Sequence, residues 1–518
     1  MRITDLLDHS AMLYRDDEAV FDGRTRCAFG ELSSRAAATA RGLAHLGVRA
    51  GERVAIVSTN RVEYVEAYFA LARLGVVVVP VNWRLRATEL EYQLQDSESV
   101  AVLAEERFVE ALELCRAACP RVRTWITFDG DRAGWSRFAT CSVSTGAPSY
   151  TAAITENDVA IQMYTSGTTG APKGAMLTHR NVCALVSSWM HELRLGSAPD
   201  RFLQVTPLFH VGGMLQVMSA VAAGASLRLL PEFLPGPALD ALEHEAVTHT
   251  LFVPAMLQWL LAEKDIASRR FPSLRLIVYG AAPMPVQTLT RALDVFGCDF
   301  LQGYGLTETA GVVTTLRPAD HRFAAGSEPP ARLASAGRAV LGCEVRVVDA
   351  SGRDVELGAI GEVLVRGEQV GPGYWRRPEE TAEAFRDGWF RTGDLATLDE
   401  HGYVTIVDRL KDMILVAGEN VYPGEIESIL REHPGLADVA VIGIPHEHWG
   451  EEVLALVVLR PGSEVGDREL IQHCRAKLAR FKCPTRVERR ASLPRNAAGK
   501  LQKRELREPY WAGRSRRV

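Results

Sequence analysis

Short, continuous apolar runs alternate with amphipathic segments along the first three hundred residues. Residues 54–57 (VAIV) and 76–79 (VVVV) are such runs, and the apolar positions between them recur with a helical period up to Gly75. Strands that are buried on both faces of a parallel sheet have this composition. The alternation recurs after residues 202–205, 250–253 and 276–279. It predicts an α/β fold whose large N-terminal domain contains doubly wound sheets.

The pattern changes after about Ala331. Short apolar segments at 345–348, 361–366 and 403–407 are separated by glycine turns, which favours a small β-barrel-like subdomain. After a charged break at 408–411 the chain predicts a helix at 423–432, strands at 439–443 and 452–458, a helix at 467–478 and a last strand near Arg486. We therefore expect a large domain over residues 1–408 and a mobile small α+β domain over residues 409–518.

Composition narrows the functional classes. The 518 residues carry a net charge of −5, which gives no general attraction to nucleic acid. Nine cysteines without a CxxC spacing indicate free thiols in a reducing compartment. The first 13 residues have no apolar signal-peptide core, and the uncharged stretch 211–227 is too short and glycine-rich to span a membrane. These features predict a cytoplasmic protein.

Basic side chains gather near the C-terminus, between Arg486 and Arg517. We interpret them first as a solvated domain face with a frayed end. The alternative is a face that meets an anionic thiol carrier or the surface of a membrane.

The strongest chemical signal is residues 164–174 (YTSGTTGAPKG), which combine three glycines with four Ser/Thr hydroxyls and Lys173. Glycines let the backbone turn its N–H groups inward, and the hydroxyls and the ammonium add donors for phosphate oxygens. The spacing does not fit the GxxxxGK[ST] nucleotide loop, because Gly167 and Gly170 are too close together and Gly174 follows Lys173 where Ser or Thr is required. A flexible Ser/Gly linker is the less favoured alternative.

This segment resembles the phosphate loop of the adenylate-forming superfamily, which includes acyl-CoA synthetases, aryl-CoA ligases, peptide-synthetase adenylation domains and beetle luciferases. Further segments resemble that superfamily in the same order: 207–213 (PLFHVGG), 279–283 (YGAAP), 302–308 (QGYGLTE), 389–394 (WFRTGD), 408–412 (DRLKD), 418–423 (GENVYP) and 494–500 (PRNAAGK). The likeness is strongest to bacterial fatty-acyl-CoA and 4-coumarate-type CoA ligases. It implies an ATP-dependent acid–thiol ligase that uses ATP, Mg²⁺ and coenzyme A.

The chemistry requires a carboxylate to attack the α-phosphorus of ATP, so positive charge must offset the repulsion between two anions. The resemblance implies that Lys500 bridges carboxylate and phosphate, that Glu308 holds Mg²⁺ together with Thr168, and that Thr307 donates to the α-phosphate. His210 matches a gate beside the reacting carboxylate, although a lone histidine on an apolar segment is often a core residue.

Further nucleotide and thiol contacts are implied in the same way. Tyr304 offers a ring to adenine, Asp394 resembles the ribose-hydroxyl acceptor, and Lys411 matches the hinge on which the small domain swings. The full predicted binding set is Thr165, Ser166, Gly167, Thr168, Thr169, Lys173, Gly280, Ala281, Ala282, Gln302, Gly303, Tyr304, Gly305, Asp394, Arg409, Lys411 and Gly418. Leu415 and Ala417 stand where luciferases and plant coumarate ligases often have lysines, which makes an oxidative role less favoured.

An acyl pocket is expected near Trp189, residues 210–214, Trp259 and the glycine-tyrosine segment at 302–308. No acidic residue is placed to meet an α-amino group, so amino-acid activation is disfavoured. Medium- or long-chain fatty acids, with a slight preference, and aromatic or alicyclic acids stay open. So do transfer to a separate carrier protein, peripheral membrane contact and a homodimer. The lysines and glutamate of the phosphate site argue against a non-catalytic binding protein.

Overall fold

A computed structural model describes residues 1–141, 153–165, 171–193, 195, 199–324, 327–417, 419–495 and 501–512. Two compact units are described in turn below. The larger comprises Met1–Val345 and Val365–Phe390, and the smaller comprises Arg346–Leu364 and Arg391–Val518. The predicted boundary after residue 408 stays a prediction. No helix in the described part of the chain is long and apolar enough to cross a membrane.

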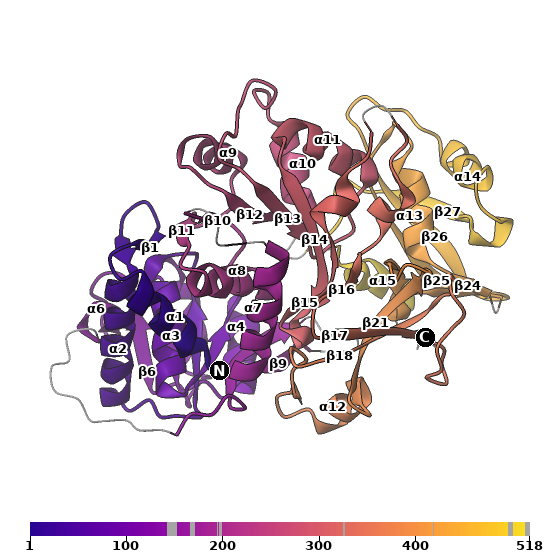
Figure 1. Ribbon diagram of the computed structural model, residues 1–518. Coiled ribbons are helices and arrows are strands. Elements are labelled where there is room, and N and C mark those ends of the chain that lie inside the picture. Colours follow the sequence, from indigo (N-terminus) through magenta and orange to yellow (C-terminus); the bar gives the residue numbers. More distant parts are fainter. Residues whose placement is uncertain are drawn as a thin grey trace. The chain divides into compact units, whose positions relative to one another are not determined.

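The first sheet of the larger unit, which contains the strands labelled β6 and β9 in Figure 1, is parallel at its centre and antiparallel at one end. In spatial order its strands are β19 (Gly373–Tyr374), β9 (Lys173–Thr178), β8 (Val159–Thr165), β4 (Val77–Pro80), β3 (Arg53–Val57), β5 (Ala101–Ala104), β6 (Thr124–Thr127) and β7 (Ser136–Arg137). The β-α-β unit predicted at its centre is confirmed. Helix α3 (Val62–Leu74) joins β3 to β4 and ends at Gly75, whose φ of 70° is the left-handed value that glycine adopts most readily.

The second sheet is also parallel at its centre, and it has antiparallel pairs at both ends. Its order is β16 (Arg338–Ala339), β15 (Gly311–Leu316), β14 (Asp299–Leu306), β13 (Leu276–Gly280), β12 (His249–Phe252), β10 (Arg201–Gln204), β11 (Ser226–Leu229), β1 (Glu18–Phe21) and β2 (Arg26–Ala28). Strands β1, β11, β10, β12, β13 and β14 are parallel, and the flanking pairs are antiparallel. The predicted doubly wound arrangement is therefore confirmed for the inner strands.

One apolar core serves both sheets. It contains Ile56 and Ile161 of the first sheet and Leu227 and Leu301 of the second. Between them pack helices α2 (Phe29–His45), α3, α7 (His179–Leu193) and α8 (Val211–Ala222). The uncharged stretch that begins at Val211 is thus a buried helix, as predicted, because its side chains face this shared core. The remaining helices of the unit are α1 (Ile3–Leu13), α4 (Ala87–Asp96), α5 (Val109–Arg116), α6 (Phe138–Cys141), α9 (Pro235–His244), α10 (Pro254–Ala262), α11 (Val286–Phe296) and α12 (Pro378–Ala384).

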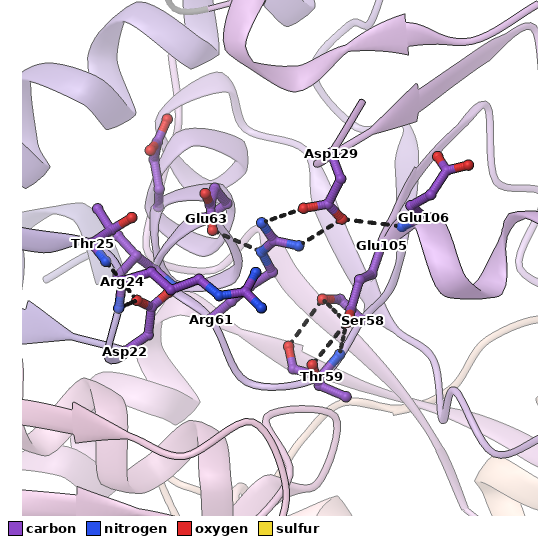
Figure 2. A network of polar contacts seen from close by, with 12 residues as sticks. Asp22, Arg24, Thr25, Ser58, Thr59, Arg61, Glu63, Glu105, Glu106 and Asp129 are labelled. Carbon is purple, nitrogen blue, oxygen red and sulfur yellow. Dashed lines mark hydrogen bonds and ion pairs between the residues drawn. The ribbon is translucent and has the colours of Figure 1, made fainter. Parts of the chain in front are cut away.

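Polar side chains at the carboxyl ends of β3, β5 and β6 form hydrogen bonds and ion pairs with one another (Figure 2). Arg61, just before α3, donates two 2.9 Å hydrogen bonds to Asp129, which follows β6. Glu105, directly after β5, accepts hydrogen bonds from Ser58 and Thr59, which follow β3. Ligands often bind at this edge of a parallel sheet. Here the charges are mutually paired, so the network holds three strand ends in register.

The short strands predicted after residue 331 are present as β17 (Cys343–Val348), β18 (Gly361–Gly367) and β22 (Val404–Arg409). They are accompanied by β20 (Phe385–Arg386) and β21 (Trp389–Leu398). In the smaller unit β22 pairs antiparallel with β21, so that Asp394 lies opposite Arg409.

The C-terminal part of the smaller unit is α+β, as expected. Its sheet contains β24 (Glu419–Val421), β23 (Ile414–Val416), β26 (Gly450–Leu459) and β25 (Leu436–His446), with β27 (Arg486–Arg489) parallel to β26. Helices α13 (Pro423–Arg431) and α14 (Asp467–Arg475) share its core. Helix α15 (Lys503–Trp511) was not predicted, and α14 ends three residues before the expected Leu478.

All nine cysteines are free and all but Cys298 are buried. Burial raises the pKa of Cys27 and of Cys474 to about 12, so both thiols are protonated and unreactive at neutral pH. The prediction of free buried thiols is confirmed.

Candidate active site

The phosphate segment connects two antiparallel strands of the larger unit. Thr165 ends β8 and lies opposite Lys173, which begins β9. The loop is therefore a strand–loop–strand connection, whereas the GxxxxGK[ST] loop joins a strand to a helix. Six predicted positions lie outside the described residues: Ser166, Gly167, Thr168, Thr169, Gly418 and Lys500.

The end of this loop is held by aromatic side chains and by the backbone. The hydroxyl of Tyr92 donates to the carbonyl of Pro172 over 2.8 Å, and the N–H of Trp375 donates to the carbonyl of Gly174 over 2.8 Å. The ammonium of Lys173 lies 5.3 Å from the ring centroid of Tyr374. A cation over an aromatic face is attracted to it. These contacts hold Lys173 in place at the start of β9.

Glu308 is buried in a short turn of 3₁₀-helix directly after β14. Its Oε1 accepts a 2.9 Å hydrogen bond from the hydroxyl of Tyr374. Tyr374 therefore contacts both Lys173 and Glu308, which are far apart in the sequence. Sequence reasoning missed Tyr374, because nothing in its local pattern distinguishes it from a packing residue.

The donor set fits Mg²⁺ bound together with a polyphosphate. In the described part of the chain, no group of three or more His, Cys, Asp or Glu side chains could hold a metal by itself. Mg²⁺ is commonly bound through one or two carboxylates plus substrate phosphates and water. Glu308, oriented by Tyr374 and near the lysine of the phosphate segment, meets that requirement. Its role as a metal ligand stays a prediction.

The two glycine segments meet at the carboxyl ends of β13 and β14. Gly280 lies opposite Gly303 in the ladder, and a Cβ on Gly280 would come within 2.1 Å of the carbonyl of Gly303. A Cβ on Gly305 would lie 1.6 Å from the carbonyl of Gly311. These positions accept only glycine. The side chains of Ala281, Gln302, Tyr304 and Thr307 are at least partly exposed around this close approach. The assignment of this segment to adenine stays a prediction.

Ala281 has a φ of 65°, which is left-handed and uncommon for a residue with a side chain. Such strain collects at functional turns. It lies between Gly280 and Ala282, two of the predicted nucleotide contacts.

In the smaller unit the predicted ribose-binding residues form a direct pair. Nε of Arg409 lies 2.6 Å from Oδ1 of Asp394, and the Asp394 carboxylate is buried. Its backbone N–H donates to the hydroxyl of Thr392. The carboxylate is therefore held in one orientation, as an acceptor for two neighbouring hydroxyls would need to be.

Lys411 is half-buried, which differs from the solvated hinge residue expected from sequence. Burial lowers the pKa of Lys411, and the charges of Arg409 and Arg507 lower it further against the opposing effect of Asp412. The hinge role of Lys411 stays a prediction.

The basic C-terminal residues are not all solvated, and this corrects our first interpretation. Nζ of Lys503 lies 2.8 Å from Oε1 of Glu427 in α13, and Nη1 of Arg507 lies 2.7 Å from Oδ1 of Asp412. Asp408 accepts a 2.6 Å hydrogen bond from the N–H of Gly424 at the start of α13. The segment from Asp408 to Asp412 is thus bound to both α13 and α15 within the smaller unit.

His210 is the N-terminal flanking residue of α8 and its ring centroid lies 4.5 Å from that of Phe209. Among the described residues its Nε2 is buried without a hydrogen-bond partner. Burial lowers the pKa of His210 to about 4, with a further contribution from Arg84. The imidazole is therefore neutral at pH 7 and retains one basic nitrogen.

A narrow pocket lies in the larger unit and is lined in part by the first two turns of α8. Its walls are Trp189, Leu193, Phe202, Gly212, Leu215, Gln216, Thr250, Leu251 and Val278. Of the predicted wall residues, Trp189 and Gly212 line it, whereas the rest of 210–214 and the segment 302–308 do not. Trp259 was predicted but does not line it: the side chain is 53% exposed. A Cβ on Gly303 would lie 3.5 Å from the Trp189 ring, so Trp189 separates the pocket from the nucleotide segment.

Comparison with known proteins places the chain in a family. The profile of the family described as AMP-binding enzyme matches residues 7–375, and that of the AMP-binding enzyme C-terminal domain matches residues 425–500. A fatty acid–acyl-carrier-protein ligase of Streptomyces coeruleorubidus is 38% identical over 96% of this chain and 94% of its own length. A feruloyl-CoA synthase of an Amycolatopsis species is 39% identical over 95% and 96%.

Solved structures that resemble this chain support the same family assignment. An anthranilate CoA ligase in complex with anthranoyl-AMP superposes with a TM-score of 0.87 at 28% identity, covering 98% of this chain and 97% of that one. ATP-bound MatB from Rhodopseudomonas palustris also gives 0.87, at 32% identity, covering 98% and 99%. The chain belongs to the AMP-binding, adenylate-forming enzyme family. It is an AMP-forming acid–thiol ligase, and enzymes of this class use ATP, Mg²⁺ and CoA.

Replacement of Tyr374 by phenylalanine is expected to slow adenylation about tenfold and to raise the Mg²⁺ concentration needed for half-maximal rate. The change removes the hydrogen bond to Glu308 and keeps the ring under Lys173. A hydrogen bond to a charged group contributes about 1.5–3 kcal/mol, and each 1.4 kcal/mol in a barrier is about tenfold in rate. Initial rates over a Mg²⁺ series test this. Tyr14→Phe at an exposed tyrosine is the control, and an unchanged Mg²⁺ dependence in Tyr374→Phe would contradict the assignment.

Proposed function

We propose that the protein is a carboxylic acid–CoA ligase. In the first step the acid and ATP give acyl-AMP and pyrophosphate, and in the second acyl-AMP and CoA give acyl-CoA and AMP. One observation carries the proposal. The apolar pocket and the glycine segment proposed for adenine share the Trp189 side chain as a common wall. An acyl-adenylate needs such adjacent compartments, because its acyl group and its nucleotide are joined at one phosphate.

In the first step an oxygen of the carboxylate attacks the α-phosphorus and pyrophosphate leaves. Lys173 and Lys500 supply positive charge, and Thr307 supplies a hydroxyl donor. Mg²⁺ held through Glu308 would offset the charge of the phosphates. Apolar side chains around the pocket exclude water, which protects the adenylate from hydrolysis.

In the second step the thiol sulfur attacks the acyl carbon, and AMP leaves with the bonding electron pair. The thiol proton must pass to a base. We assign this role to His210, because its buried Nε2 has no hydrogen-bond partner among the described residues. Burial lowers the pKa of the ring to about 4, so the imidazole is a weak base until the charge of the bound substrates raises that pKa.

The pocket supports an acid with an apolar body. Its walls are aliphatic and aromatic except for Gln216 and Thr250. Relatives are named for fatty acids, feruloyl-CoA, indoleacetate and 2-succinylbenzoate, so aliphatic and aromatic acids are both represented. A cytoplasmic location is supported by nine free thiols, which a reducing compartment preserves.

Transfer to a carrier protein is the second candidate, favoured by the relative named as a fatty acid–acyl-carrier-protein ligase. A thiol competition separates the two. Preformed acyl-adenylate on the enzyme is offered CoA and a purified pantetheine-bearing carrier protein at equal concentration. We expect acyl-CoA to form faster. Preferential loading of the carrier would replace the CoA proposal by the second candidate.

A further inference from the structure

One polar side chain in the wall of the acyl pocket has an unused hydrogen-bond acceptor. Gln216 lies on α8 and is only 4% exposed. Its Nε2 donates a 2.8 Å hydrogen bond to the carbonyl of Leu203. Among the described residues, its Oε1 is buried and has no hydrogen-bond partner. The amide thus has one satisfied end and one unsatisfied end.

The orientation of this amide is fixed by its neighbour. The Leu203 carbonyl can only accept, so the NH₂ group of Gln216 must face it and the oxygen must point elsewhere. The other polar wall residue, Thr250, donates its hydroxyl to the same Leu203 carbonyl and is also committed. The remaining pocket residues carry no side-chain polar group except the indole of Trp189. No described side chain of the wall supplies the missing donor to Oε1.

A buried acceptor without a partner destabilises the folded state, and folded proteins keep few of them. Because Gln216 lines the pocket, a molecule that binds there and displaces the side chains packed on Oε1 would supply the partner. An unfunctionalised alkyl chain would displace water and leave Oε1 unsatisfied. A molecule with an O–H or N–H at that depth would satisfy it and would also fill the apolar walls.

We propose that the acid activated by this enzyme carries a hydrogen-bond donor, a phenolic hydroxyl or a ring N–H, which binds Oε1 of Gln216. The indole of Trp189 and the ring of Phe202 give the pocket flat apolar walls, which suit a donor mounted on an aromatic ring. Gln216 is then the residue that selects donor-bearing aromatic acids over alkyl acids of similar size. This inference rests on the proposed function of the same site.

Matched acid pairs test the proposal on the unmodified enzyme. The pairs are hydroxyphenylpropanoic against phenylpropanoic acid and indolylpropanoic acid against its benzofuranyl analogue, with octanoic acid as the alkyl probe. For at least one pair, kcat/KM in pyrophosphate exchange is expected to favour the donor-bearing acid by about a hundredfold. Sites built to bind a substrate hydroxyl discriminate by up to about 10⁴–10⁵-fold. Equal kcat/KM within both pairs, or preference for octanoic acid, would overturn it.

The variant Gln216→Leu assigns the discrimination to this residue. The preference for the donor-bearing acid is expected to fall to within about threefold, because the leucine offers no acceptor to the donor. Gln204→Leu is the matched control. Gln204 is also buried, also bonds a carbonyl through Nε2 and also has an unpartnered Oε1, but it does not line the pocket. A preference that persists in Gln216→Leu, or that collapses equally in Gln204→Leu, would overturn the assignment.

Failure of this inference can be told apart from failure of the proposed function. Exchange that is robust with octanoic acid and indifferent to the donor refutes the role of Gln216 alone. Exchange that is absent with every acid, in a protein that binds ATP, refutes the ligase activity and the inference with it.

Discussion

Replacement of Lys500 by alanine is expected to lower acid-dependent ATP–pyrophosphate exchange by about 10²–10³-fold or more. In the proposed mechanism this lysine bridges the carboxylate and the α-phosphate, where charge builds up as the two anions meet. Removing one such donor costs roughly that factor in other enzymes. Thiolysis of supplied acyl-adenylate by CoA is expected to be nearly unchanged, because that step forms no new bond to phosphorus.

The two half-reactions are measured separately on the same preparation. Lys477→Ala is the control, because Lys477 pairs with Glu432 on the surface of the smaller unit. Equal losses in both half-reactions of Lys500→Ala would show that the lysine supports the fold or the second step, and would contradict its assignment to adenylation.

Replacement of Glu308 by glutamine is expected to reduce the single-turnover rate of acyl-adenylate formation by about 10²-fold or more. The amide is the same size and can still accept the hydrogen bond from Tyr374, so the change removes charge with little change of shape. A neutral amide is a weaker Mg²⁺ ligand than a carboxylate, and the charge of the phosphates is then less well offset.

Glu308→Asp is the companion variant, because it keeps the charge and shortens the reach. We expect it to respond to added Mg²⁺ and Glu308→Gln to respond much less. Full activity in Glu308→Gln at low Mg²⁺ would exclude Glu308 as a metal ligand and leave it a structural partner of Tyr374.

The parts of the fold that follow from local sequence were predictable. The unit formed by β3, α3 and β4 was identified from two apolar runs, a helical repeat and Gly75, and each signal lies within a few residues of the feature it predicts. The segment Gly373–Tyr374 was not. Its two residues pair with β9, almost two hundred positions earlier, and no local pattern encodes that partner.

The candidate site residues also divide into those recognised from local sequence and those recognised only from their contacts in the folded chain. Segments rich in glycine and hydroxyl side chains can be recognised from composition alone. That Gly280 and Gly303 lie opposite each other in neighbouring strands could not be read from either segment. Tyr374 and Gln216 gain their meaning only from what they contact in space. Lys503 illustrates the reverse error. A lysine in a basic tail is usually solvated, but folding of α15 places this one against Glu427.

ATP–pyrophosphate exchange measured with and without CoA tests the acyl-adenylate mechanism most directly. We expect exchange that requires the acid and Mg²⁺ but no thiol, followed by release of AMP and formation of acyl-CoA when CoA is added. Release of ADP and phosphate, or exchange that appears only after CoA is added, would rule out an acyl-adenylate intermediate and with it the proposed ligase reaction.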